Sequence, residues 1–333
     1  MMTRAALRKV ATCTTLVLLT ISGAQSRAEE PLSNDLLGAG RGVDHVMIAV
    51  RDINRASDFF SSHLGFNAKI WGKFPDGVEN AGTYFGNRSY LELLGIYDRN
   101  KAAQTTIAKL LEKHEGALGM ALHVSSAERA ARFLKSRGFD VKGPTDYPSA
   151  ADGAQNADPW WWRTVSFDKP TLPGGDVFLI EYNEQVGEDY RKKDPQGFDA
   201  ARTHPNTAKH IESVCVAVKD LKRAVKAYES IGLSTGRQVR LPHFGATGRE
   251  ILAGAGVVML LQANNTNSMV ASFIEMRGEA IMGLSIKVAE LDTARKILET
   301  NIKQTFTPYE GAYGRSVLVP AEVTHGVWVE MFQ

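Results

Sequence analysis

The sequence predicts an α+β protein of four β-α-β-β-β units that associate in pairs. A strand with apolar residues at alternate positions, followed by an amphipathic helix, recurs four times along the 333 residues. Each unit also closes on an apolar run that contains a single acid or amide, and a polar, proline-containing stretch at 183–209 separates the second unit from the third. A recurrence of this size indicates internal duplication rather than four unrelated pieces.

The first unit illustrates the order of elements. Residues 44–50 form a strand with an apolar face, and His45 lies on the opposite face. Asp52 is expected to cap the following helix, which Gly65 ends as a left-handed residue. Three short strands separated by glycine, proline and asparagine turns are expected near 66–72, 82–86 and 90–96.

The remaining units repeat this order, with opening strands near 120–124, 214–218 and 284–288. The second unit is longer because of an insertion at 148–159, rich in Ala, Asp and Gly, which we expect to be a loop. The resulting organisation is a first domain over 43–184, a linker over 185–209 and a second domain over 210–333.

The N-terminus resembles a cleavable export signal. Arg4, Arg8 and Lys9 precede an apolar stretch that is shorter than the about 20 residues needed to cross a bilayer. Ser26 and Ala28 are small residues at the positions that a signal peptidase reads. We therefore expect a signal peptide over 1–28, a short linker over 29–42 and a periplasmic or secreted mature protein without a membrane span.

Composition excludes several classes of protein. The chain is 44% hydrophobic and 23% charged, which is ordinary for a globular protein and argues against a disordered or collagen-like chain. Its 39 basic and 37 acidic residues nearly cancel, so no long-range field favours nucleic acid as a partner. A small molecule is the expected partner.

Several motifs resemble the vicinal oxygen chelate superfamily, and more narrowly its glyoxalase-like branch. They are the stretches 43–46 (VDHV), 90–93 (YLEL), 162–182, which includes LPGG and FLIEY, and 320–330, which ends in HGVWVE. The resemblance implies that paired modules curl their mixed sheets into two cups of the glyoxalase, bleomycin-resistance and dihydroxybiphenyl dioxygenase type. It also implies a metal inside a cup, held by residues of first and last strands, and no nucleotide cofactor.

Strand alternation places three candidate ligands in the first cup. His45 faces away from the helix side, and Glu92 and Glu181 are expected to point inward from the closing strands. One imidazole and two carboxylates suit a divalent ion such as Zn, Ni, Mn or Fe(II). The superfamily's fourth ligand position falls on Gly119, which has no side chain, and His123 lies about 13 Å further along an extended strand.

The second cup has a poorer set of groups. Its corresponding positions are Ser213, Gln262, Gly283 and Glu330, and His210 is expected to fall on the face opposite Ser213. Extradiol dioxygenases, as the resemblance implies, use two histidines and one glutamate in this half, so that alternative is weakened. The second domain is expected to be packing support or a lid.

Two hypotheses about function follow. The first is a metal-dependent lyase or isomerase acting on a small carbonyl or vicinal-oxygen substrate, with Glu92 or Glu181 as the proton shuttle. The second is a sequestering or accessory protein that binds a small molecule without chemistry. In either case the expected substrate-binding residues are Tyr90, His123, Trp162 and Arg163.

Overall fold

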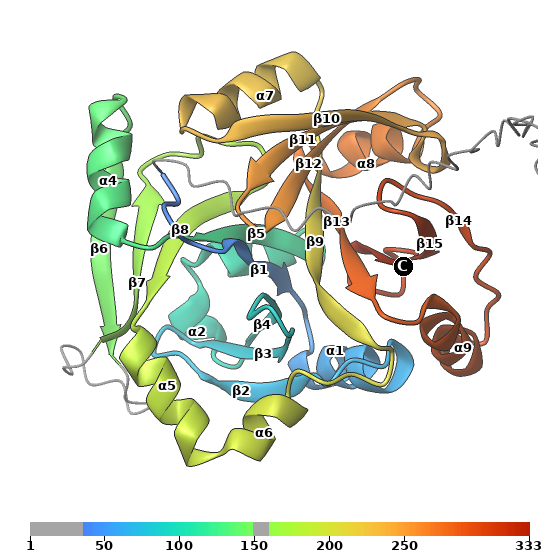
Figure 1. Ribbon diagram of the computed structural model, residues 1–333, viewed down its shortest axis with the longest axis horizontal. Coiled ribbons are helices and arrows are strands. Elements are labelled where there is room, and N and C mark those ends of the chain that lie inside the picture. Colours follow the sequence, from blue (N-terminus) through green and yellow to red (C-terminus); the bar gives the residue numbers. More distant parts are fainter. Residues whose placement is uncertain (1–35, 149–159) are drawn as a thin grey trace, which may run out of the picture. The chain divides into compact units, whose positions relative to one another are not determined.

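The computed structural model describes residues 36–148 and 160–333, and these belong to one compact unit. The described chain forms two eight-stranded mixed sheets (Figure 1). The first sheet has the order β2-β3-β4-β1-β5-β8-β7-β6 and the second the matching order β10-β11-β12-β9-β13-β16-β15-β14. The predicted α+β fold of paired modules is therefore confirmed.

The strands of the first sheet are β1 (Gly42–Ala49), β2 (Lys69–Lys73), β3 (Val78–Tyr84), β4 (Tyr90–Ile96), β5 (Gly116–His123), β6 (Val141–Pro148), β7 (Trp160–Phe167) and β8 (Asp176–Tyr182). Those of the second are β9 (Ala208–Ala217), β10 (Ser234–Leu241), β11 (Ala246–Ala253), β12 (Gly256–Ala263), β13 (Ala280–Val288), β14 (Tyr309–Glu310), β15 (Arg315–Val319) and β16 (Trp328–Phe332).

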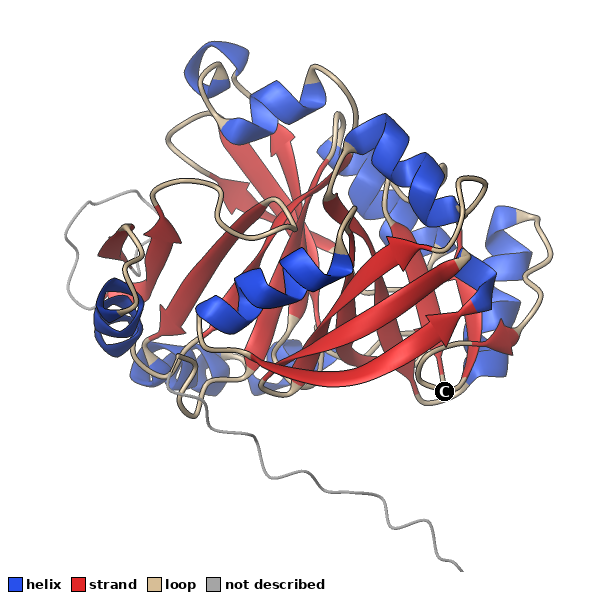
Figure 2. Ribbon diagram, turned by 90° about the horizontal axis from the view of Figure 1, so that it is seen from above, coloured by secondary structure: helices blue, strands red, loops and turns tan. Residues whose placement is uncertain are grey.

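The α-helices are α1 (Ile53–Asp58), α2 (Arg99–Ala102), α3 (Thr106–Leu111), α4 (Ala127–Ser136), α5 (Glu184–Lys193), α6 (Pro195–Ala200), α7 (Leu221–Ser230), α8 (Met269–Arg277) and α9 (Leu291–Ile302). Seen from above, helices lie around the strands of both sheets (Figure 2). None of the described helices is long and apolar enough to cross a bilayer.

Pairing between modules follows the same rule in both sheets. Each opening strand runs parallel to the closing strand of its own module and antiparallel to the opening strand of the other module, so β1 lies between β4 and β5, and β9 between β12 and β13. Two modules thereby share one continuous sheet whose centre is the pair of opening strands. The candidate residues of β1 lie at this centre.

Local sequence explains the helix that follows β1. The Asp52 side chain accepts a hydrogen bond from the backbone of Arg55 at 3.0 Å, as the expected N-cap does. Gly65 ends the segment at φ +74°, a conformation that a side chain would strain. The helix is short in the structure because residues 59–63 continue it as one π-helical turn.

One hydrophobic core is shared by the helix-covered faces of both sheets. It holds Val46 and Ile48 from β1 together with Val214 and Val216 from β9, all of them fully buried. The opposite faces of the two sheets are the inner faces of the two cups. We call these the N-terminal cup, which carries His45, and the C-terminal cup, formed on β9–β16.

Of the segments that were expected to lack regular structure, the structure describes the linker but not the signal peptide or most of the insertion. The predicted linker over 185–209 contains most of α5 and all of α6, and it is anchored to the first sheet through His204. The imidazole of His204 accepts from the Asn67 amide at 3.1 Å and donates to the Tyr84 carbonyl at 2.9 Å. The predicted signal peptide and nearly all of the predicted insertion, 149–159, lie outside the described residues.

Candidate active site

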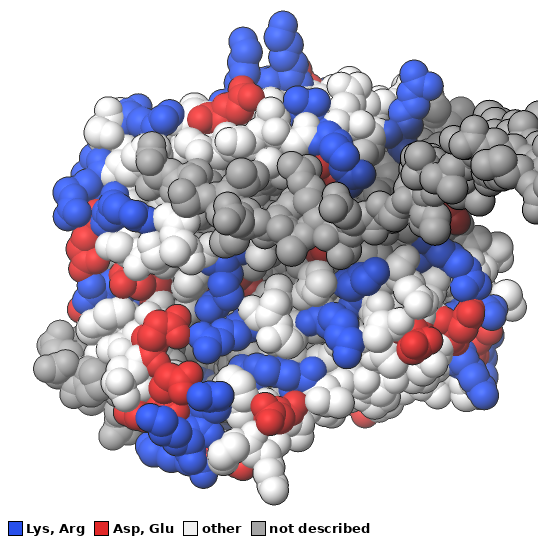
Figure 3. Space-filling view, in the orientation of Figure 1, with Lys and Arg blue, Asp and Glu red and all other residues white. Residues whose placement is uncertain are grey.

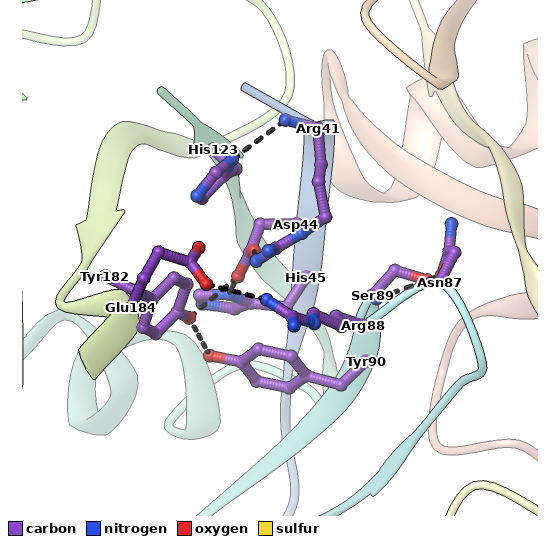
Figure 4. Close-up of polar contacts among 10 residues, drawn as sticks. All are labelled: Arg41, Asp44, His45, Asn87, Arg88, Ser89, Tyr90, His123, Tyr182 and Glu184. Carbon is purple, nitrogen blue, oxygen red and sulfur yellow. Dashed lines mark hydrogen bonds and ion pairs between the residues drawn. The ribbon is translucent and has the colours of Figure 1, made fainter. Parts of the chain in front are cut away.

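A β-bulge turns two consecutive residues of β1 toward the same cup. Val43 pairs with Leu122 and His45 with Ala121, so Asp44 is an extra residue without a partner on β5. As a result the Asp44 carboxylate lies 2.8 Å from Nδ1 of His45 (Figure 4). Both side chains are buried.

Glu92 is the next polar group along this line, on the other side of His45 from Asp44. Its Oε2 lies 3.6 Å from Nε2 of His45, and its Oε1 accepts a hydrogen bond from the Asn80 amide at 2.9 Å. The Glu92 side chain is 12% exposed, against 3% for His45. Glu92 is therefore the member of the set that is more accessible to a small molecule.

Two further side chains besides His45 bind the Asp44 carboxylate. Tyr182 donates to its Oδ1 at 2.9 Å, and Arg41 donates to its Oδ2 at 2.9 Å. Burial alone would raise the pKa of Asp44, but the hydrogen bond and charge of His45, with the charge of Arg41, outweigh it and lower the pKa. Asp44 is thus an ionised, buried carboxylate that orients His45.

Two tyrosines close this network. The hydroxyl groups of Tyr90 and Tyr182 lie 3.2 Å apart, and the Tyr90 ring stacks on His45 at 4.3 Å between ring centres. Burial raises the pKa of both phenols well above the usual value, so both are neutral donors at ordinary pH. The imidazole of His45 is consequently fixed by a carboxylate at one edge and by an aromatic ring on one face.

Aromatic rings form the wall of the N-terminal cup next to Glu92. Trp71 stacks on Tyr84 at 4.7 Å and meets Tyr90 edge-on at 5.6 Å. Phe178 meets His45 edge-on at 5.7 Å. The opposite end of the cup is filled by apolar residues of α2 and α3 packed against Met47 and Leu94. The polar groups of the cup therefore lie at the aromatic end and not at the apolar end.

The expectation that Glu181 points into this cup is wrong. Glu181 lies on the helix side of β8, where its Oε2 accepts from the backbone of Ala127, the first residue of α4, at 2.8 Å. Gln262 and Gln333 bind the first residues of α7 and α9 in the same way, at 2.7 and 2.9 Å. The polar residue near the end of these closing strands is therefore a helix cap and not an inward ligand.

Strand register explains the error. Leu94 pairs with Ala49 at the end of β1, and Ile180 pairs with His123 at the end of β5. Leu94 and Ile180 therefore occupy corresponding positions. Glu92 and Phe178 each lie two residues before them, so Phe178 is the counterpart of Glu92 in the second module. The true counterpart of Glu181 is Gly95, one residue after Leu94.

The other predicted substrate-binding residues are dispersed. Trp162 pairs with Tyr182 on the cup side and stacks on Tyr147 at 5.3 Å. Arg163 lies on the helix side instead, where it forms ion pairs with Glu128 and Asp146, so the structure does not place it among the substrate-binding residues expected in the cup.

His123 does lie beside the network, although it does not reach His45. Its Nδ1 accepts from the backbone of Arg41 at 2.8 Å, and its ring stacks on Tyr182 at 5.9 Å. Burial and the charge of Arg41 lower the pKa of His123 to about 4, which keeps the imidazole neutral. His123 therefore belongs to the support of Asp44.

The second half of the chain also supports this network. The turn between β11 and β12 reaches β1, where the backbone of Ala255 donates to the Arg41 carbonyl at 2.8 Å and Gly254 bridges to Gly42. A Cβ on Gly42 would lie 1.6 Å from the Ala253 carbonyl oxygen, so only glycine fits this approach. Packing support was one of the two roles expected of the second half, and this contact between the β11–β12 turn and β1 is one way in which the second half provides it.

The donor set does not fit the divalent ion that the superfamily resemblance implies. His45 and Glu92 lie close enough to share an ion, but the second module offers Gly119 and Phe178 at the two matching positions. A Cβ on Gly119 would lie 1.9 Å from the Asp176 carbonyl oxygen, so the close approach of β8 excludes any side chain there. Among residues 36–148 and 160–333 no group of three or more His, Cys, Asp or Glu side chains is placed to hold a metal ion.

Several site residues were not predicted from the sequence. Asp44 and Tyr182 are adjacent to predicted residues, but only the bulge and the strand register bring them to His45. Asn80 and Trp71 lie on β3 and β2, where the sequence showed only short strands. Their signal is alternation along β2 and β3, which fixes a face only once the register is known.

Comparison with known proteins agrees with this architecture. A family model described as a glyoxalase-like domain matches residues 43–232. A hypothetical protein from Staphylococcus aureus is similar in structure, with a TM-score of 0.57 and 15% identity over 87% of this chain and 98% of that one. A mutant of 4-hydroxymandelate synthase from Streptomyces coelicolor has a TM-score of 0.61 and 14% identity, over 88% and 92% of the two chains. No curated protein sequence matches.

Proposed function

Because the chain belongs to the glyoxalase-like domain family of the vicinal oxygen chelate superfamily, we propose that its N-terminal cup binds a small carbonyl compound and that Glu92 exchanges a proton with it. This is the isomerase or lyase chemistry of the sequence-based hypothesis, with Glu92 in the proposed role and Glu181 outside the site. The observation that carries the proposal is that both oxygens of Glu92 have a polar neighbour, Asn80 on one side and His45 on the other.

The proposed step is abstraction of a proton from a hydroxyl-bearing carbon next to a carbonyl group. The proton moves to the Glu92 carboxylate, and the electron pair of the C–H bond becomes that of an enediolate whose charge lies on the substrate oxygens. The hydroxyl proton of this intermediate passes to the charged oxygen, and return of the first proton from Glu92 to the former carbonyl carbon completes an isomerisation. Asp44 and His45 act as positioning residues, since Asp44 holds the imidazole of His45, whose Nε2 lies 3.6 Å from Glu92.

A divalent ion would have only His45 and Glu92 as protein ligands among the described residues, fewer than the three that catalytic sites of this kind retain. The proposed step is therefore written without one. Tyr90 and Trp162, together with the Trp71 and Phe178 rings, are the proposed contacts for the body of the substrate, because they line the cup side of their strands.

Proton exchange in D₂O tests this proposal without knowledge of the product. We expect the purified protein to accelerate loss of the C–H signals of hydroxyacetone in ¹H NMR, and the Glu92→Gln variant to lose at least about 100-fold of that rate, the usual contribution of a positioned base. Exchange that requires added Zn²⁺ after chelation would overturn the metal-free form of the proposal.

The second hypothesis, binding without chemistry, is favoured by the absence of ligand side chains at Gly119 and Phe178. It predicts that ligand-observed NMR detects binding of small carbonyl compounds while neither the wild type nor Glu92→Gln exchanges protons. A third reading, the extradiol dioxygenase, has no support in the C-terminal cup, where Ser213 occupies the position of His45 and Met259 that of Glu92.

Export remains part of the proposal. The predicted signal over 1–28 would be removed, so mature protein from the periplasm or medium should begin at Glu29. Mass spectrometry of the intact protein tests this, and a chain that retains residues 1–28 in the cytoplasm would contradict it.

A further inference from the structure

The C-terminal cup contains a depression that the proposed function does not use. Its volume is about 500 Å³, and it lies on the inner face of the second sheet. Its lining residues carry opposite charges and aromatic rings: His210, Glu212, Arg237, Lys287, Ala312, Tyr313 and Phe332. It shares no residue with the N-terminal site.

A second β-bulge gathers these groups. Ile211 pairs with Ile286 and Ser213 with Ser285, so Glu212 is an extra residue on β9 in the position that Asp44 has on β1. The bulge changes the alternation, and His210 consequently faces the cup opposite Lys287. The expectation that His210 lies on the face opposite Ser213 is therefore wrong.

The charged groups differ in how they are neutralised. The Arg237 guanidinium donates to both oxygens of the buried Glu250 carboxylate, at 2.7 Å in the shortest contact. Glu212 lies 3.0 Å from His210. The Lys287 ammonium group has no carboxylate partner within ion-pair distance in the part of the chain that the structure describes, and it lies 5.0 Å from the centre of the Phe332 ring. Lys287 is therefore the cation that remains available.

Aromatic side chains form the wall beside this cation. The rings of Tyr313 and Phe332 lie 5.3 Å apart, and the Arg237 guanidinium lies 5.9 Å from the Tyr313 ring. The hydroxyl group of Tyr313 is buried beside Ser213, so its ring is the part of this side chain that lines the depression. A cation, a second cation held in place and two rings are the features of a site for a small organic anion.

We propose that the C-terminal cup is a second ligand site, which binds a small carboxylate with a planar apolar body. The carboxylate pairs with Lys287, and the body packs on Phe332 and Tyr313. Glu212 has His210 beside it, and Glu250 has Arg237, so neither acid is left unpartnered toward the ligand. The second half of the chain would then bind a ligand of its own in addition to supporting Arg41.

Three probes with the same phenyl ring, similar size and different charge test this proposal. We expect benzoate to bind the full-length protein at least about tenfold more tightly than benzyl alcohol or benzylamine in ligand-observed NMR titrations, since about 1.4 kcal/mol corresponds to a tenfold change in affinity. The Lys287→Met variant, which keeps the length of the side chain, should lose that preference, and Lys287→Arg should retain it.

Lys226→Met is the matched control because Lys226 is an exposed lysine of α7 outside the cup. It should bind benzoate as the wild type does. Equal binding of the three probes, or benzoate affinity unchanged in Lys287→Met, would overturn the proposal. Proton exchange by Glu92 in the N-terminal cup is measured separately from benzoate binding. Failure of one proposal can therefore be told apart from failure of the other.

Discussion

Nδ1 of His45 lies 2.8 Å from Oδ1 of Asp44, its neighbour in the chain. Consecutive residues of a regular strand point to opposite faces, so this contact exists only because Asp44 is the extra residue of a bulge. The contact fixes which imidazole nitrogen faces Glu92. A single irregularity in β1 thus determines the geometry of the proposed site.

Replacing Asp44 by Asn tests whether this carboxylate also stabilises the fold. The variant leaves Arg41 without its buried partner and removes the charge that His45 and Tyr182 face. We expect a loss of roughly 3–5 kcal/mol in the free energy of unfolding, as when one partner of a buried ion pair is removed. Urea denaturation measures it. Asp168→Asn, which breaks an exposed pair with Lys142, is the control and should show no measurable change, and equal effects of the two variants would contradict the prediction.

Gly119 provides a test of the packing that excludes a ligand from the second module. Gly119→Ala places a methyl group 1.9 Å from the Asp176 carbonyl oxygen, so β5 and β8 must separate. We expect a destabilisation of about 2 kcal/mol or more by thermal or urea denaturation. Gly72→Ala on β2 meets no atom within 4 Å and is the matched control. If both variants are equally stable, the strand spacing around Gly119 is not the constraint described here.

Glu181 should act on stability and not on chemistry. Glu181→Ala removes the acceptor for the first amide of α4 and is expected to cost about 1 kcal/mol in the free energy of unfolding, the usual value for a helix cap. Glu181→Gln keeps an acceptor and should cost much less. Both variants should retain the proton exchange assigned to Glu92, and loss of exchange in Glu181→Gln would return Glu181 to the site.

His123 predicts a pH dependence of stability. Its pKa is about 4 in the folded chain, held down by burial and by Arg41, whereas an unfolded histidine titrates near 6.5. The unfolded chain therefore binds this proton first as the pH falls, and stability is lost between about pH 6.5 and 4, by roughly 3 kcal/mol in total from this residue.

Urea denaturation at pH 7.5 and 4.5 measures the effect. His123→Asn keeps an acceptor for the Arg41 amide but cannot titrate. The free energy of unfolding of this variant should therefore fall less between pH 7.5 and pH 4.5 than that of the wild type. An identical fall in both proteins would show that His123 is not the group responsible.

Much of the fold could be predicted because its signals are local. The alternation of Val46 and Ile48 required a buried face, and this placed His45 on the other side, in the cup. Asp52 and Gly65 marked the ends of a helix through capping and left-handed geometry. Glu92 was placed in the cup for the same reason as His45, since it alternates with the buried residues of β4.

The remaining site depends on register between strands that are distant in the sequence. Glu181 and Glu92 were matched because each is the one acid of an apolar run, but a shift of one residue moves a side chain to the other face. The bulge at Asp44 likewise depends on how β1 pairs with β5, more than 70 residues later. Neither feature has a signature within a single strand.

The turn at Ala253–Gly256 has a consequence for protein engineering. Its backbone fixes the position of Arg41 through the hydrogen bond from Ala255. Arg41 in turn donates to the Asp44 carboxylate from its side chain and to His123 from its backbone. Lengthening or shortening that hairpin by one residue would change no residue of the N-terminal cup. It would nevertheless move the backbone contact that positions Arg41, and with it Asp44. Grafting the first half onto another scaffold would therefore require carrying this hairpin along, or supplying an equivalent clamp.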